Sequence, residues 1–278
     1  ILYAGTTYGM LEYDGTSWRA IATPHSHIVR AMAKGPDGRI FVGEVGDFGY
    51  LQPDQTGAMK FVSLLAFVPQ EERDFQDIRG IHVAPEGIYF LARERLFRLT
   101  PDGQGWPTKV WRPTKPFATS YYIFGTLYVS VAGEGLARLT NDVLQPLVLP
   151  GLGDQSNANN RTAAMLPYAQ ANDQSVRQML VGTRGGQLFL LDDQGNRPTL
   201  TPFVTDAAPL FQRHGLATGP QSAAMLSDGT MGFSTASGGF LILERNGKMR
   251  RYLDRTAGIL LDGVIAAFVD RIGTVWLG

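Results

Sequence analysis

A short apolar pattern recurs along the whole chain. Each copy has two apolar or aromatic residues, then a smaller aliphatic residue, then Gly, Ala or Ser; the copy at 231–234 is the weakest. Successive copies lie about 38 to 52 residues apart, and each has the length of one buried β-strand. The small residues that close the copies are Gly5, Gly43, Ala92, Ser130, Gly182, Ser234 and Gly278.

The residues around each copy follow a constant order. An apolar strand leads through a turn of Asp, Asn or Glu with Gly into the repeated strand, which is followed by a loop, a third strand and a more polar fourth strand. The second copy shows this order at 27–33, 35–38, 39–43 and 49–51. Asp and Gly suit tight hairpins, because Asp bonds its own backbone and Gly reaches positive φ. No long segment has a period of 3.6 residues, so we expect little helix.

A repeat of this length made of short strands is typical of a β-propeller. We therefore predict an all-β propeller with seven four-stranded antiparallel blades, a six-bladed ring being the alternative. Residues 1–23 contain strands two to four of a first blade, and residues 263–278 contain only strands one and two of a last, incomplete blade. Because residue 1 lies inside a strand pattern, we expect residues 1–278 to be a single propeller domain of a longer protein. The aromatic residues of the repeated strands are expected in the core: Tyr3, Phe41 and Trp276.

Composition restricts the partners of such a domain. The 25 basic and 25 acidic residues give a net charge of +0, so nucleic acid is not expected to bind. With 0 cysteines, neither disulfides nor thiolate chemistry is possible. No apolar run reaches the roughly 18 residues of a membrane span, so we expect contact with a membrane only through segments outside this chain.

Polar residues in the loops at one end of the blades are the candidate ligand site. Propellers bind ligands at the mouth of the channel, where the loops between strands two and three and the loops between blades meet. Three of these loops are enlarged, at 69–77, 151–161 and 206–221. Arginines and carboxylates beside an aromatic ring can hold sugar hydroxyls or an acidic ligand. The candidates are Glu44, Asp47, Phe48, Arg73, Asp74, Arg93, Arg161 and Arg184.

Catalytic and metal-binding patterns are weak. His25 and His27 could face the same side, but zinc needs a third ligand and neither His82 nor His214 has a suitable spacing. Asp47-Phe48-Gly49 spells a kinase triplet without the other kinase motifs. There is also no Gly-x-Ser-x-Gly elbow. We therefore assign no catalytic residue, no metal and no cofactor.

The end of the chain resembles a known repeat. Residues 270–278 are similar to the Asp-x-x-Gly-x-apolar-Trp-x-Gly core of the two-component regulator propeller repeat, and residues 5–14 look like its continuation. Residues 133–136 also resemble this continuation, and residues 43–51 followed by 74–78 resemble the early blades of such sensors. In the middle copies Leu180 and Gly232 replace the tryptophan.

The resemblance implies a periplasmic sensor domain of an inner-membrane signalling protein that binds a small carbohydrate or acidic ligand and acts as a homodimer. Such proteins carry a histidine kinase, hybrid two-component or diguanylate cyclase output. We expect this domain to be non-catalytic. Two other classes stay open: a metal-dependent propeller enzyme of the lactonase or lyase type, and a protein-interaction scaffold.

Overall fold

The computed structural model describes residues 1–23, 28–168, 178–194, 197–219, 221–260 and 263–278. Within them the chain forms two compact units, Ile1–Phe117 and Ala118–Gly278. Each unit has its own sheets and its own clusters of buried side chains. Strands dominate both units, as the short repeated patterns predict.

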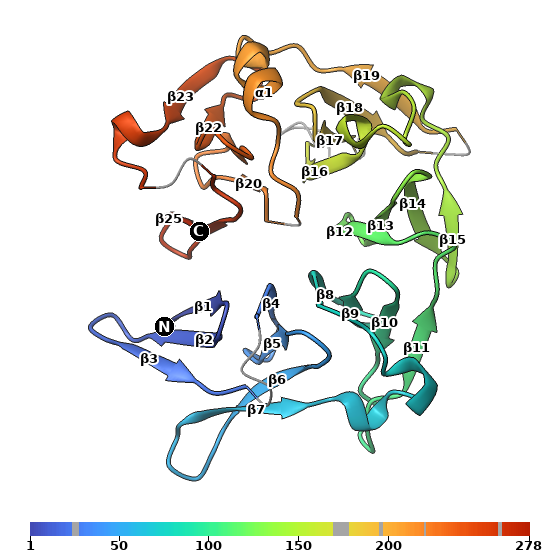
Figure 1. Ribbon diagram of the computed structural model, residues 1–278, viewed down its shortest axis with the longest axis vertical. Helices are drawn as coiled ribbons and strands as arrows, with labels where there is room; N and C mark the ends of the chain where they lie inside the picture. The colour runs from blue at the N-terminus through green and yellow to red at the C-terminus, as the bar shows by residue number, and fades with distance from the viewer. Residues whose placement is uncertain (24–27, 169–177, 195–196, 220, 261–262) are drawn as a thin grey trace. The chain divides into compact units, whose positions relative to one another are not determined.

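The first unit contains three antiparallel sheets in which sequential strands are neighbours (Figure 1). One sheet has three strands, and the next two have four each. The strands are β1 (Leu2–Thr6), β2 (Gly9–Tyr13) and β3 (Trp18–Ile21); β4 (Ala31–Lys34), β5 (Ile40–Gly43), β6 (Phe48–Pro53) and β7 (Met59–Ser63); β8 (Gly80–Ala84), β9 (Gly87–Leu91), β10 (Leu96–Leu99) and β11 (Thr108–Trp111).

The second unit contains three four-stranded sheets and one two-stranded hairpin. The strands are β12 (Phe117–Ile123), β13 (Thr126–Val131), β14 (Gly135–Thr140) and β15 (Val143–Pro146); β16 (Thr162–Pro167), β17 (Gln178–Thr183), β18 (Leu188–Asp192) and β19 (Thr199–Pro202); β20 (Ala223–Met225), β21 (Met231–Ser234), β22 (Phe240–Leu243) and β23 (Met249–Leu253); β24 (Ala267–Val269) and β25 (Val275–Leu277).

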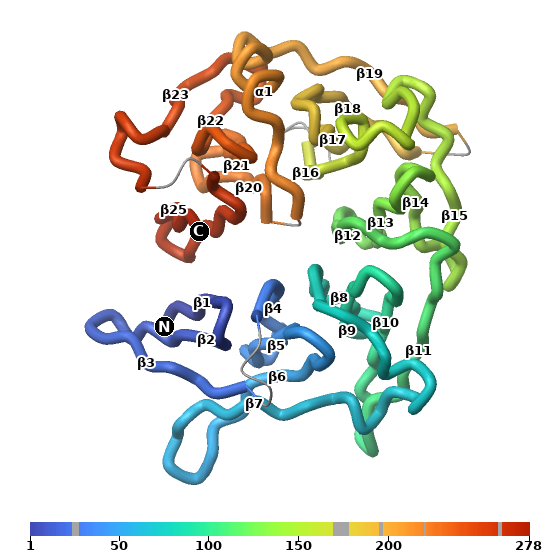
Figure 2. Tube along the Cα trace, viewed as in Figure 1, coloured from blue at the N-terminus to red at the C-terminus, as the bar shows by residue number. Residues whose placement is uncertain are grey.

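Helix is scarce in the described residues, as the sequence predicts. The one α-helix, α1 (Ala208–His214), lies in the enlarged connection between β19 and β20 (Figure 2). No helix in the described part of the chain is long and apolar enough to cross a membrane. The short 3₁₀ helices are η1 (Leu65–Phe67), η2 (Gln70–Glu72), η3 (Pro150–Leu152), η4 (Ala158–Asn160) and η5 (Arg255–Ala257).

These sheets form the antiparallel blades of a β-propeller, and five of those in the described residues have four strands. The predicted strand order within a blade is confirmed, because each repeated strand pairs with its predecessor and its successor in the complete blades. The predicted number of seven blades is wrong. Six sheets of three or four strands form blades in the described residues, since the last copy of the repeat forms only the hairpin β24–β25.

Aspartates in the hairpin turns hold the ends of the strands. The Oδ1 atom of Asp37 accepts a hydrogen bond from the Arg39 amide at 3.0 Å, and Asp270 does the same for the Ile272 amide at 3.0 Å. Asp54 accepts from the Thr56 amide at 2.8 Å. An Asp side chain thus replaces a backbone acceptor at the turn, which explains why Asp recurs before Gly in the sequence.

The closing glycines of the repeated strands allow adjacent blades to approach. A methyl group at Gly43 would lie 2.4 Å from Ile78 Cγ2, and one at Gly5 would lie 2.4 Å from the Val29 carbonyl oxygen. Ile78 and Val29 both belong to the segment that enters the next blade. At these two positions contact between blades therefore requires a small residue, whereas a methyl group at Gly278, the last closing glycine, would meet no described atom within 4 Å.

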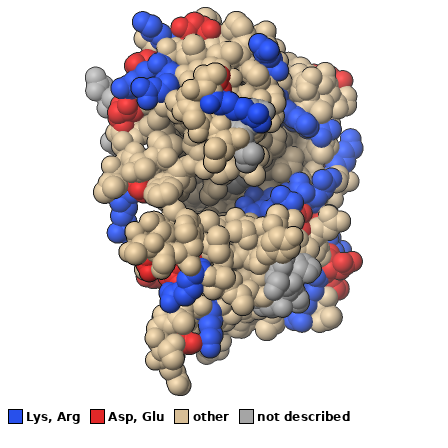
Figure 3. All heavy atoms as spheres, turned by 60° about the vertical axis from the view of Figure 1, so that its left-hand side comes forward, with Lys and Arg blue, Asp and Glu red and all other residues tan. Residues whose placement is uncertain are grey.

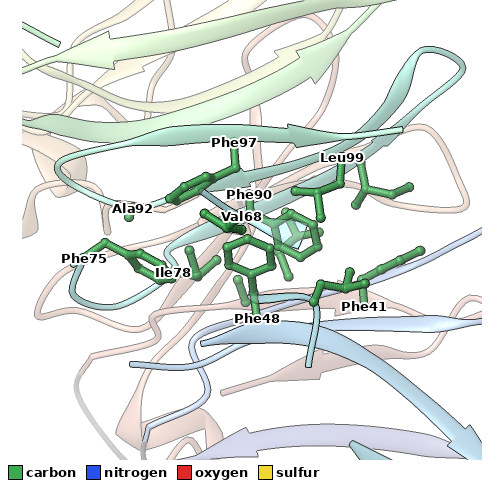
Figure 4. Close-up of a cluster of buried hydrophobic side chains, with 13 residues drawn as sticks. Phe41, Phe48, Val68, Phe75, Ile78, Phe90, Ala92, Phe97 and Leu99 are labelled. Atoms are coloured by element: carbon green, nitrogen blue, oxygen red, sulfur yellow. The ribbon is translucent and has the colours of Figure 1, made fainter. Parts of the chain in front are cut away.

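Aromatic side chains fill the space between the two four-stranded blades of the first unit (Figure 4). Phe48 is fully buried, and its ring stacks on Phe90 with 4.3 Å between the ring centroids. Phe97 lies at 5.1 Å and Phe75 at 5.7 Å from the Phe48 ring. Phe41 joins the same cluster. Burying such rings is a main source of stability for the stacked blades.

The three aromatic residues expected in the core differ in their surroundings. Phe41 is buried as predicted, with 3% of its surface exposed. Trp276 is 39% exposed, and its Nε1 donates to Asp270 Oδ2 at 2.9 Å, so the core prediction is wrong for this residue. Tyr3 is partly buried, and its hydroxyl donates to Glu12 Oε1 at 3.3 Å. In the Asp-x-x-Gly-x-apolar-Trp motif, the tryptophan thus stabilises the turn that begins at the aspartate of the same motif, through a side-chain hydrogen bond.

Replacing Gly43 by Ala is expected to destabilise the protein by about 1–3 kcal/mol, because the new methyl group collides with the Ile78 side chain near its backbone. Gly219→Ala is the matched control, since a methyl group added there would have no described atom within 4 Å. Urea unfolding of both variants measures the difference. Equal stability of Gly43→Ala and Gly219→Ala would contradict the requirement for close blade contact.

Acid is expected to weaken the turns. Hydrogen bonds from Thr56, followed by Lys60, lower the pKa of the Asp54 carboxyl, and a hydrogen bond from Thr230 lowers the pKa of Asp228. A lowered folded-state pKa gives stability that is present above the unfolded value of about 3.9 and is lost as pH falls through the folded value. The urea midpoint should therefore drop between about pH 5 and pH 3.

The variant Asp54→Asn is the control for this pH dependence. Asn keeps the acceptor of the turn but cannot titrate, so its midpoint should fall less over the same range. A midpoint that stays constant down to about pH 3 would show that the turn carboxylates contribute no such stability.

Candidate functional site

The eight candidate residues all lie at the same end of their blades. In an antiparallel meander, the loop between strands two and three and the connection to the next blade share one end. Glu44 and Asp47 lie between β5 and β6, and Arg93 lies between β9 and β10. Phe48 is the first residue of β6, Arg184 lies between β17 and β18, and the others lie in connections between blades: Arg73, Asp74 and Arg161.

Glu44 is the most unusual of these residues. Its side chain is fully buried, yet neither carboxylate oxygen has a hydrogen-bond partner in the described part of the chain. Its backbone is fixed, since its amide donates to the Asp47 carbonyl at 3.0 Å and its carbonyl accepts from the Ile78 amide at 3.1 Å. Burying a carboxylate without a partner is costly, so Glu44 is retained at the expense of stability.

Asp47 and Phe48 are held by the protein itself. Asp47 Oδ1 accepts from the Ser63 hydroxyl at 2.7 Å and from the Phe48 amide at 2.7 Å. The Phe48 ring belongs to the aromatic core described above and is not exposed. Asp47 therefore positions the loop, and Phe48 does not offer its ring to a ligand.

The remaining candidates of the first unit have three different surroundings. Arg73 donates from Nε to the Val68 carbonyl at 2.9 Å and from Nη2 to the Ala66 carbonyl at 3.3 Å, which ties it to the end of η1. Asp74 is exposed. Arg93 is partly buried, and in the described residues its guanidinium has no hydrogen-bond or ion-pair partner. Asp74 and Arg93 are thus available to a ligand, whereas Arg73 is occupied.

A cluster that sequence reasoning missed lies beside Glu44. Asp77 forms ion pairs with Arg30 at 2.7 Å and with Arg79 at 3.1 Å. The Asp77 side chain is 9% exposed, whereas those of Arg30 and Arg79 are 48% and 36% exposed. Asp77 also forms a β-bridge with Val45 in the Glu44 loop. The guanidinium groups of Arg30 and Arg79 are therefore both held by the buried Asp77 carboxylate and remain partly exposed to solvent.

A signal for these arginines was present in the sequence. Arg30 directly precedes β4, Arg79 directly precedes β8 and Arg161 directly precedes β16. The three residues thus occupy the same place in their repeats, at the start of the first strand. Aligning the repeats on their first strands would have indicated Arg30 and Arg79 along with Arg161.

In the second unit, the structure brings Arg161 and Arg184 together. The Arg184 amide donates to the Arg161 carbonyl at 2.9 Å, and the Arg184 carbonyl accepts from the Leu216 amide at 3.0 Å. Arg184 is exposed, and the buried Nε of Arg161 has no hydrogen-bond partner in the described residues. The two arginines are therefore neighbours on adjoining loops.

Of the four histidines considered as metal ligands, His82 and His214 lie in the described residues. His25 and His27 lie outside the described residues. Within the described ranges, no group of three or more His, Asp or Glu side chains could hold a metal ion. The arrangement of charged groups here suits the recognition of a polar ligand through hydrogen bonds and ion pairs.

The fold defines the chain as a β-propeller, and solved structures of this class resemble it. One is the extracellular domain of BT4673 from B. thetaiotaomicron, assigned as a hybrid two-component system, with a TM-score of 0.69, 14% identity and coverage of 99% of this chain and 35% of that chain. The corresponding domain of BT3049 from the same organism has a TM-score of 0.69, 15% identity and coverage of 99% and 36%. The chain thus spans about a third of the length of these two.

An enzyme also shares the fold. The virginiamycin B lyase of Staphylococcus aureus has a TM-score of 0.62 and 16% identity, with coverage of 98% of this chain and 85% of that chain. No protein-family model matches the sequence, and no curated protein matches it. The extracellular sensor domains are consistent with the resemblance to the two-component regulator propeller repeat. At these identities the similarity establishes the fold alone.

Replacing Glu44 by Met is expected to stabilise the protein by about 1–3 kcal/mol, because an apolar side chain of similar volume replaces a buried carboxyl group that has no hydrogen-bond partner in the described residues. Glu71→Met, at an exposed position in η2, is the control and should change stability by less than about 0.5 kcal/mol. Urea unfolding provides the comparison. A loss of stability in Glu44→Met would mean that the carboxylate makes favourable interactions in the folded protein.

Proposed function

We propose that residues 1–278 form the ligand-sensing, extracytoplasmic propeller of a bacterial two-component or diguanylate cyclase signalling protein, and that this domain is itself non-catalytic. The observation that carries the proposal is that two extracellular domains of hybrid two-component systems match 99% of the chain. The repeat signature at residues 270–278 supports the same class. The location would be the periplasm, in a protein anchored in the inner membrane.

The arrangement of charges supports a small polar ligand rather than nucleic acid. Basic and acidic side chains are interspersed on the face in Figure 3, and the net charge is +0. Nucleic-acid binding needs a basic field. In the first unit, the groups that can reach a ligand are Asp74, Arg93 and the arginine pair on Asp77. Guanidinium and carboxylate groups together suit a carbohydrate or an acidic small molecule.

The proposed mechanism is a binding equilibrium. The full-length receptor would be a homodimer with two arrangements of its sensor domains. A ligand would favour one arrangement only if it binds that arrangement more tightly. The Glu44 carbonyl accepts a hydrogen bond from the Ile78 amide, and Ile78 packs against Gly43 of the preceding blade. A ligand that moves the Glu44 loop would therefore also affect the contact between these two blades.

Replacing Arg93 by Gln is expected to weaken binding of the ligand about tenfold or more, since a charge-assisted hydrogen bond contributes roughly 1.5–3 kcal/mol. A thermal-shift screen of oligosaccharides and small acids first identifies a compound that raises the Tm. Titration calorimetry then compares Arg93→Gln with Lys60→Gln, which removes one positive charge at the opposite end of a blade, beside Asp54. If no compound stabilises the fold but a partner protein does, the domain is an interaction scaffold.

The enzyme alternative is supported by the lyase fold. A metal-dependent lactonase or lyase would purify with a stoichiometric metal ion, which elemental analysis of the protein detects. A sensor domain would not need one. Outside residues 1–278, a sensor is expected to have a membrane-spanning helix and a kinase or cyclase output domain.

A further inference from the structure

We propose that a pocket in the second unit, formed around the end of α1, binds a small anionic ligand. The pocket has a volume of about 290 Å³. This volume lies just below the roughly 300–1,000 Å³ of typical ligand sites, so the pocket suits a single-ring molecule. The proposal does not depend on the sensor function, since any propeller could bind such a ligand. The lining residues central to it are Arg213, His214, Ser237, Tyr252, Asp254 and Arg255.

The helix that carries two of these residues is anchored to its blade at both ends. Before its first turn, Asp206 Oδ1 accepts from the Met249 amide at 2.6 Å. Within the helix, the Phe211 ring is fully buried and packs edge-on against Phe233, with 5.5 Å between the ring centroids. At its end, the Gly215 carbonyl accepts from the Ala236 amide, which follows β21, at 3.1 Å. The backbone that carries Arg213 and His214 is therefore held in place against the blade.

The loop between β21 and β22 forms the second wall. A methyl group at Gly238 would lie 2.3 Å from His214 Cγ, so glycine is needed for the loop backbone to contact the imidazole face. Gly239 has φ +93° and would place a methyl group 2.1 Å from the Leu253 carbonyl oxygen. His214 Nδ1 and Ser237 Oγ are 3.3 Å apart. The loop between β21 and β22 thus packs against the end of α1 on one side and against the end of β23 on the other.

The third wall adds an aromatic ring and a carboxylate. The Tyr252 ring lies 6.4 Å from the His214 ring between centroids. Asp254 Oδ1 accepts from the Thr256 amide at 2.9 Å and from its hydroxyl at 2.6 Å. Two arginines against one aspartate leave the pocket with a positive excess even when the histidine is neutral. Guanidinium groups bind carboxylates and phosphates strongly, and the Ser237 hydroxyl, which donates to the His214 carbonyl at 3.4 Å, adds a polar group to the lining.

The pocket belongs to the end of the blades that carries the other candidate residues. It lies between the connection after β19, the loop after β21 and the segment after β23. The Leu216 amide, two residues beyond His214, donates to the carbonyl of Arg184 at 3.0 Å. The enlarged loop at 206–221, which the repeat spacing indicates, therefore supplies the helix that builds the pocket.

Titration calorimetry of the whole chain with glucuronate, glucose 6-phosphate and glucose tests the proposal. We expect saturable binding of at least one anionic probe and at least tenfold weaker binding of neutral glucose. Binding of glucuronate alone identifies a carboxylate site, and binding of glucose 6-phosphate alone identifies a phosphate site. Equal affinity for glucose, or no binding of either anion, would overturn the proposal.

Two variants place the binding in this pocket. Arg213→Gln should reduce the affinity for the bound anion at least tenfold without changing the Tm. Arg251→Gln removes an exposed positive charge from the same blade, outside the pocket, and should leave the affinity unchanged. An equal loss in both variants, or no loss in Arg213→Gln, would show that the anion binds elsewhere.

Discussion

Close contact between successive blades is the constraint on which the rest of this structure depends. A four-stranded blade cannot bury its own faces, so it is stable only against a neighbour. Here the closing glycine of a repeated strand touches the segment that enters the next blade, as Gly43 does with Ile78 and Gly182 does with Leu216. Aromatic rings such as Phe48 and Phe90 then fill the remaining space. At Gly5, Gly43 and Gly182, the small residue that recurs in the sequence therefore reflects close packing between blades.

The same contact positions the chemistry. The segment that touches the closing glycine leads directly into the charged residue at the start of the next blade, as Ile78 leads into Arg79. The loop after the glycine carries Glu44, whose carbonyl accepts from the Ile78 amide. Blade packing and the proposed ligand recognition thus involve some of the same residues at one end of the blades. This is why an unfavourable buried carboxylate can persist there, since stability gained by packing offsets its cost.

The sequence predicted local structure well and spatial neighbours poorly. Strand order, turns and the scarcity of helix follow from patterns within a repeat, which local physical chemistry dictates. The blade count was wrong because the two strands predicted for residues 263–278 were counted as part of a seventh blade, whereas β24 and β25 form only a two-stranded hairpin. Phe48 looked like a loop aromatic beside charges, but its burial depends on Phe75 and Phe97, which follow much later in the chain. Asp77 was missed because one of its two ion pairs is with Arg30, which is remote in sequence.

The central claim is that ligands are recognised at the end of the blades that carries the loops between strands two and three. Hydrogen–deuterium exchange with and without a stabilising ligand tests it most directly. The account predicts slower exchange in peptides that cover these loops and the connections between blades, such as 44–47 and 73–79 in the first unit or 210–216 and 236–239 in the second. Slowing confined to the hairpin turns at the opposite end, such as 35–38 and 54–58, would contradict it.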